Sequence, residues 1–240
     1  MQTFRQPHVS GAASASSVSK AYSGDSCRFA LVLLLAVLPL ATLPLASQAA
    51  SVQVLVRDSN GQPVPDAVVY ADGDAPYAPA KPVAGIDIEQ KERKFLPLVT
   101  VIQVGSQISF PNNDTVRHHI YSFSPAKKFE QKLYNGTAAT PVIFDKAGTV
   151  VLGCNIHDRM LAYILVVDTP HFGKSDAAGK LKIEHMPNGK YTFRVWHYNQ
   201  AGNAPEQGQQ LSKDGHSLEF KLSLKSAPES KPRSVEFDYK

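Results

Sequence analysis

Cysteine is scarce in this 240-residue chain, which has two cysteines against 15 glycines and 17 prolines. It has no C-x-x-C-H haem-attachment sequence and no C-x-x-C redox pair. Charge is also low: 19% of residues are charged and the net charge is +4, too little to indicate nucleic-acid binding by electrostatics alone. The hydrophobic content of 43% is ordinary for a globular protein and argues against a disordered chain or a multi-span membrane protein.

Long apolar runs are missing except near the N-terminus, at residues 29–45. This run follows a polar segment with three basic residues and precedes the small residues 46–50. The order predicts a Sec-type signal peptide over residues 1–49, and hence a periplasmic protein without stable membrane insertion. The alternative is a retained membrane anchor, because the run is close to the lower length limit for a spanning helix.

Cleavage after Ala49 would remove Cys27 and leave Cys154 as the single cysteine. An exported protein with one cysteine cannot form an internal disulfide. Cys154 is therefore a candidate reactive or metal-binding thiol.

The remainder of the chain has the pattern of an all-β protein. Val52, Val54 and Val56 alternate with other residues, residues 161–168 form a continuous apolar run, and Asn-Gly pairs mark turns. Helical periodicity is weak. About ten short strands are expected, which favours one or two β-sandwiches.

Two segments carry side chains that bind metals. Residues 153–160, GCNIHDRM, place Cys154, His157 and Met160 at C-x2-H-x2-M spacing on a short loop between apolar strands. Upstream, His118 and His119 begin another strand. Strand alternation sends these two histidines to opposite faces, so one of them should join the loop residues; we favour His118, with His119 as the alternative.

One thiolate, two imidazoles and one thioether are the ligands of an electron-transfer copper site. A structural zinc site would use more cysteine or histidine in a closed tetrahedron. Taken singly, each residue has an ordinary structural explanation, since a lone buried cysteine is usually a small core residue. The joint spacing favours a site for one copper ion.

The spacing resembles that of the cupredoxins, the blue copper proteins, and in particular the short ligand loop of amicyanin and pseudoazurin, with plastocyanin similar. In that family a strand ends in an aromatic residue, an Asn follows soon after, and a ligand His comes eight residues after the aromatic; Phe110, Asn112 and His118 fit. The resemblance covers roughly residues 83–168. It implies a Greek-key β-sandwich and a type 1 copper held by His118, Cys154, His157 and Met160. The chain departs from the family at His119, where Asn is usual.

The flanking segments resemble the two ends of a carboxypeptidase-regulatory or transthyretin-like β-sandwich, in their Asn-Gly turns and strand alternation. The predicted organisation follows the chain in order. It comprises a leader (1–49), a flanking β segment (50–82), the copper domain (83–170), an accessory β segment (171–225) and a flexible tail (226–240).

The predicted function is that of a periplasmic electron carrier in which one copper cycles between Cu(I) and Cu(II). It is not expected to be an enzyme, because no substrate pocket or acid–base pair is visible. By resemblance, the partner would be a c-type cytochrome, a periplasmic dehydrogenase or a reductase. The alternatives are a copper chaperone or buffer that uses the same ligands, and a non-catalytic β-sandwich with degenerate metal residues.

Overall fold

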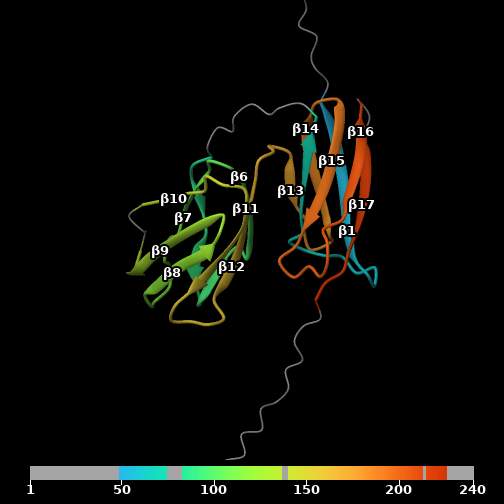
Figure 1. The fold of residues 1–240 in the computed structure, drawn as a ribbon. Coiled ribbons are helices and arrows are strands. Elements are labelled where there is room, and N and C mark those ends of the chain that lie inside the picture. The colour runs from blue at the N-terminus through green and yellow to red at the C-terminus, as the bar shows by residue number, and fades with distance from the viewer. Residues whose placement is uncertain (1–48, 75–82, 137–139, 213–214, 226–240) are drawn as a thin grey trace, which may run out of the picture. The chain divides into compact units, whose positions relative to one another are not determined.

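A computed structural model describes residues 49–74, 83–136, 140–212 and 215–225. Within these ranges the chain forms strands and turns and no helix, so the all-β class is confirmed (Figure 1). Accordingly, the described part holds no helix long and apolar enough to span a membrane. The predicted tail, and all of the predicted leader except Ala49, lie outside the described residues.

A five-stranded and a three-stranded sheet lie in the middle of the chain. The larger sheet has the order β6-β12-β11-β8-β9 and consists of β6 (Val99–Gln103), β8 (His118–Ser124), β9 (Lys127–Tyr134), β11 (Gly148–Cys154) and β12 (Leu161–Val167). The smaller sheet has the order β10-β7-β3 and consists of β3 (Ile86–Asp87), β7 (Gln107–Ser109) and β10 (Val142–Ile143). Between β3 and β6 the chain forms a hairpin of β4 (Glu89–Lys91) and β5 (Lys94–Leu96).

The two sheets share one hydrophobic core, and alternation along the strands decides which residues enter it. In β11, Val150, Leu152 and Cys154 are buried, and in β8 the buried residues include His118 and Ile120. Successive side chains of a strand point to opposite faces, so a residue's position relative to the apolar ones fixes its face. Cys154 and His118 therefore point inward with the aliphatic residues.

Two further sheets are built from segments on either side of this unit. One has the order β14-β1-β17 and consists of β1 (Ala50–Asp58), β14 (Lys180–Met186) and β17 (His216–Leu222). The other has the order β13-β2-β15-β16 and consists of β2 (Val68–Gly73), β13 (Phe172–Lys174), β15 (Gly189–Trp196) and β16 (Glu206–Leu211). They share a second core that includes Val52, Val54 and Val56. The predicted domain boundaries, and an accessory sandwich as a separate domain, stay predictions.

The described residues hold more strands than the ten or so expected from the sequence. The additional strands, such as β3 and β10, are two or three residues long. A strand that short contains at most one cycle of alternation, so it leaves no pattern in the sequence.

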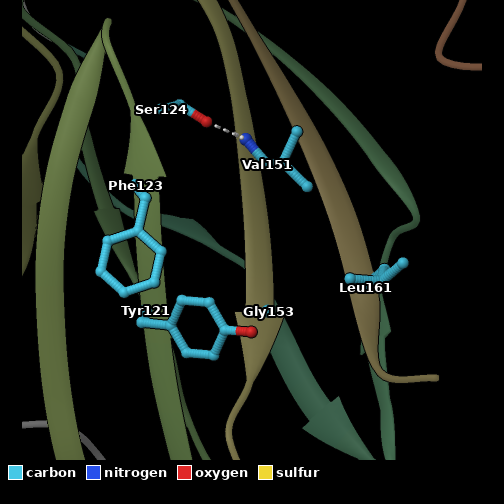
Figure 2. A pocket seen from close by; sticks show the side chains of 6 residues that line it. All are labelled: Tyr121, Phe123, Ser124, Val151, Gly153 and Leu161. Carbon is cyan, nitrogen blue, oxygen red and sulfur yellow. Dashed lines mark hydrogen bonds between the residues drawn. The ribbon is translucent and has the colours of Figure 1, made fainter. Parts of the chain in front are cut away.

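The outer face of the five-stranded sheet is covered in one half and open in the other. Val99 and Leu165, on β6 and β12, are buried in a cluster with Val68 of β2. Across β8, β11 and β12, the residues around Phe123 line a shallow groove of about 310 Å³, and the Phe123 side chain is 78% exposed (Figure 2). The Tyr121 ring reaches across β11 at Gly153, where the glycine leaves room for it (Figure 2).

An alanine at position 153 should destabilise the protein. Its Cβ would lie 2.7 Å from Tyr121 Cζ, so the ring has to move. Inserting a methyl group into a close contact of this kind costs about 1–3 kcal/mol of the free energy of unfolding. Urea denaturation of Gly153→Ala, alone and in a Tyr121→Ala background, measures the cost and should show that it disappears in that background. The matched control is Gly208→Ala, where a Cβ meets nothing within 4 Å; an equal effect of the two alanines would contradict the contact.

Candidate metal centre

Three metal-binding side chains meet at one end of the five-stranded sheet. Cys154 Sγ lies 3.6 Å from His118 Nδ1 and 3.8 Å from His157 Nδ1. The two imidazole centroids are 5.0 Å apart. One donor atom from each of the three residues lies within 4.8 Å of the others. Among the described residues this is the single group of three or more His, Cys, Asp or Glu side chains whose donor atoms lie close enough together to hold a metal ion.

Backbone pairing between β11 and β8 brings these residues together although His118 and Cys154 are 36 positions apart. Cys154 is paired with Ile120 at the end of β11. The next residue, Asn155, continues the connection because its N–H donates to the His119 carbonyl at 3.0 Å. The His118 and Cys154 side chains are therefore held by the sheet itself.

The loop between β11 and β12 supplies His157. The Met160 N–H donates to the His157 carbonyl at 2.9 Å and closes the loop into a turn. His157 is half-buried, whereas His118 is 0% and Cys154 is 4% exposed. The cluster thus has two deeply buried donors and one that lies nearer to solvent.

The spacing of the donor atoms fits a metal ion. Bonds of about 2.3 Å to sulfur and about 2.0–2.1 Å to imidazole nitrogen, as at zinc sites, place two donors about 3.5–3.8 Å apart at tetrahedral to trigonal angles. The two Sγ–Nδ1 distances of 3.6 and 3.8 Å fall in this range. The chemistry of the set, a thiol and two imidazoles, suits copper.

His119 lies outside the cluster, because alternation along β8 places it on the opposite face of the sheet from the buried His118. Its Nε2 lies 2.7 Å from Glu130 Oε1 on the neighbouring strand β9. Of the two candidate histidines, His118 is therefore the one that the fold places beside Cys154.

Met160 is buried, with 1% of its surface exposed, and belongs to the same core cluster as Cys154. Its position three residues after His157 agrees with the spacing noted in the sequence. Its role as a fourth ligand stays a prediction.

Asp114 contacts the side of the His118 ring that faces away from Cys154. Its Oδ2 lies 3.0 Å from His118 Nε2. An ionised carboxylate can only accept hydrogen bonds, so Nε2 carries the ring proton and donates it. The lone pair of Nδ1 is then free to face Cys154.

Backbone N–H groups fix the Asp114 carboxylate. Arg93 N–H donates to Oδ2 at 2.7 Å, and Thr115 N–H donates to Oδ1 at 2.8 Å. The Arg93 N–H, with the His118 N–H next in importance, lowers the pKa of Asp114 from 3.8 to about 2. Hydrogen bonds to a charged group favour its charged form, so Asp114 is ionised at neutral pH.

Asn112 organises the segment that leads into His118. Its side-chain N–H groups donate to the carbonyls of Val116 and Tyr134 at 3.0 and 2.7 Å. Its Oδ1 accepts the Asp114 N–H at 3.0 Å. Asn112 is 3% exposed, so these bonds replace water for buried backbone groups.

A second buried amide lies beside this segment. Gln90 Nε2 donates to the Phe110 carbonyl at 3.0 Å and to the Tyr134 hydroxyl at 2.6 Å. Burial raises the pKa of Tyr134 to about 12, so its hydroxyl remains a neutral donor to the Phe110 carbonyl.

Sequence reasoning missed both Asp114 and Gln90. An acid four residues before a candidate ligand histidine was the available signal for Asp114; Gln90 left none, because it lies far from the motif in sequence.

No family model matches this sequence, and no curated protein matches it significantly. Solved structures do match in part. A purple cupredoxin from Nitrosopumilus maritimus is 21% identical, with 35% of this chain and 100% of that chain covered and a TM-score of 0.31.

An amicyanin variant in the reduced state is 18% identical, with 41% of this chain and 99% of that chain covered and a TM-score of 0.30. A copper-containing nitrite reductase from Thermus scotoductus is 22% identical, with 48% of this chain covered and a TM-score of 0.34. This chain covers 28% of that reductase. Because these identities and TM-scores are low, the case for a metal site rests on the geometry above.

Acid should weaken the fold through Asp114. Its pKa in the folded state, about 2, lies below 3.8, so its contribution to stability is present above about pH 4 and is lost as the pH falls toward 2. Urea denaturation of the metal-free protein and of Asp114→Asn, at pH 5, 3 and 2, should show the stability difference between them shrinking with acid. A constant difference would contradict the assignment.

Asn112→Ala should cost about 2–4 kcal/mol of the free energy of unfolding, because three hydrogen bonds are lost at a buried position. Its neighbour Asn113 is exposed, and among the described contacts its side chain donates only to Glu89 Oε1, at 2.8 Å. Asn113→Ala is therefore the matched control and should change stability by no more than about 0.5 kcal/mol. Denaturation curves that coincide for the two variants would contradict the role given to Asn112.

Proposed function

We propose that this chain is a copper protein that carries single electrons. His118, Cys154 and His157 bind the metal, and Met160 is a weak fourth ligand. The observation that carries the proposal is the placement of two imidazole nitrogens 3.6 and 3.8 Å from one buried thiol sulfur. Copper, when bound, supplies reversible one-electron exchange between Cu(I) and Cu(II).

The protein's own contribution is a rigid, dry set of ligands. Cys154 binds as the thiolate, since the thiolate is the metal-binding form of cysteine. His118 and Cys154 are buried on two paired strands, so the sheet fixes their backbone positions and the surrounding core restricts their rotamers. A site whose ligands stay in place in both oxidation states needs little reorganisation when an electron arrives or leaves.

His157 is the ligand through which the electron would pass from the copper to a partner protein. It is half-buried on the loop between β11 and β12, and its neighbour Ile156 is 48% exposed. An electron would cross the shortest protein distance at this edge. The partner that we propose is a redox protein, a c-type cytochrome, dehydrogenase or reductase, in the periplasm. This location rests on the signal peptide that the sequence predicts.

The number of protein donors at the site favours electron transfer over catalysis. A catalytic metal site keeps one position open for water or substrate. Here the loop that carries His157 ends at the buried Met160, and four protein donors would leave no open position.

Copper delivery is the second function that the same residues could serve. A chaperone hands its metal to an acceptor by exchanging ligands one at a time, so its donors must be reached from outside. His118 is 0% and Cys154 is 4% exposed, which disfavours such an exchange.

A copper titration of the purified full chain tests the proposal. The wild-type protein should bind one Cu(II) with an intense visible thiolate-to-copper band and a narrow copper hyperfine splitting in the EPR spectrum. Cys154→Ser should abolish the band, and His118→Ala should abolish or strongly alter it. His119→Ala is the matched control and should keep the band.

Three other results would each contradict part of the proposal. A band that survives Cys154→Ser would exclude the ligand set. Copper bound without the band, and transferred to an apo-acceptor, would favour a chaperone. Absence of copper binding by the wild-type protein would exclude both functions.

A further inference from the structure

Asp114 is a charged residue in direct contact with His118, at the buried end of the metal cluster, and is not itself one of the donors of the cluster. Its carboxylate lies 3.0 Å from Nε2 of His118, while Nδ1 of the same ring lies 3.6 Å from the Cys154 sulfur. The ring therefore stands between a negative charge and the metal position. The His118 side chain is 0% and the Asp114 side chain 10% exposed, so water screens this charge poorly.

The backbone around Asp114 is shaped to hold this charge. The hairpin of β4 and β5 turns at Glu92 and Arg93, which have positive φ angles of 50° and 58°. A two-residue hairpin turn of type I′ requires positive φ at both central residues and usually takes Asn or Gly, because this conformation strains other residues. At this turn the Arg93 N–H points to Asp114 Oδ2 at 2.7 Å. Strained backbone that ends on a charged group beside a candidate site is a sign of function.

We propose that Asp114 is a positioning residue that sets the proton position of His118 and, through its charge, lowers the reduction potential of the copper bound there. This inference rests on the function proposed above. A carboxylate behind a ligand imidazole holds the ring in one tautomer and makes it a stronger donor. Both effects stabilise Cu(II) more than Cu(I). Reduction adds one electron from an external donor, and the Nε2 proton stays on His118, so no proton is exchanged.

Asp114→Asn separates the charge from the hydrogen bond. With its oxygen in the place of Oδ2, the asparagine can still accept from Arg93 N–H and from His118, while the negative charge and the hydrogen bond from Thr115 N–H are lost. The Cu(I)/Cu(II) ratio at a fixed electrode potential should rise at least tenfold, which is about 59 mV in midpoint potential for a one-electron couple. A mediated redox titration of the copper-loaded full chain, followed by visible absorption, measures this shift.

The matched control is Asp145→Asn, which removes the same charge at a distance. Asp145 is exposed and pairs with Lys127 at 3.1 Å. Lys127 is paired with Ser124, at the opposite end of β8 from His118. This variant should leave the midpoint potential unchanged. Equal shifts in the two variants, or no shift in Asp114→Asn, would overturn the proposal that the charge tunes the site.

The tautomer is tested without copper. In the metal-free wild-type protein, the ¹⁵N shifts of the His118 imidazole should show the proton on Nε2 and none on Nδ1. A proton on Nδ1 would overturn the positioning role whether or not copper binds, and this measurement does not depend on the variant folding. If the tautomer is as proposed but the protein takes up no copper, the positioning stands and the electron-transfer function fails.

Discussion

The pairing of β11 with β8 is the contact on which the site depends. It sets Cys154 opposite Ile120 and Gly153 opposite Tyr121, so one strand ends where the other begins its buried course. Alternation then does the rest, because His118 has the same parity as Ile120 and shares its face. A shift of the register by one residue would turn His118 outward and bring His119 inward, and the thiol would lose its buried imidazole.

The parts of this arrangement that are local in sequence could be predicted. The alternation of Val52, Val54 and Val56 indicated a strand with one buried face, and these valines do lie in a core. The loop carrying Cys154 and His157 was recognisable because its spacing is short. Strand alternation indicated that only one of His118 and His119 could join the loop residues, and the preference for His118 came from the resemblance in its spacing from Phe110.

The parts that depend on long-range contacts could not be predicted. The Asp114 carboxylate accepts a hydrogen bond from the backbone N–H of Arg93, which lies in a distant turn. Gln90 donates to the Phe110 carbonyl and the Tyr134 hydroxyl, which are also far from it in sequence. Nothing in the sequence near either residue indicates these partners, since each is defined by where the chain returns. The groove around Phe123 is equally invisible, because a partly exposed apolar strand face has the same alternation as a covered one.

The depth of Cys154 also governs the chemical lifetime of its thiol. Sulfur is oxidised by peroxide, or captured by another thiol, only when the reagent can reach it. With 4% of the residue exposed, attack on the metal-free protein requires a local opening that exposes the sulfur. The rate of thiol modification therefore reports how often the structure around Cys154 opens. Burial in the sheet thus protects a thiol that an unfolded chain would expose to oxidation.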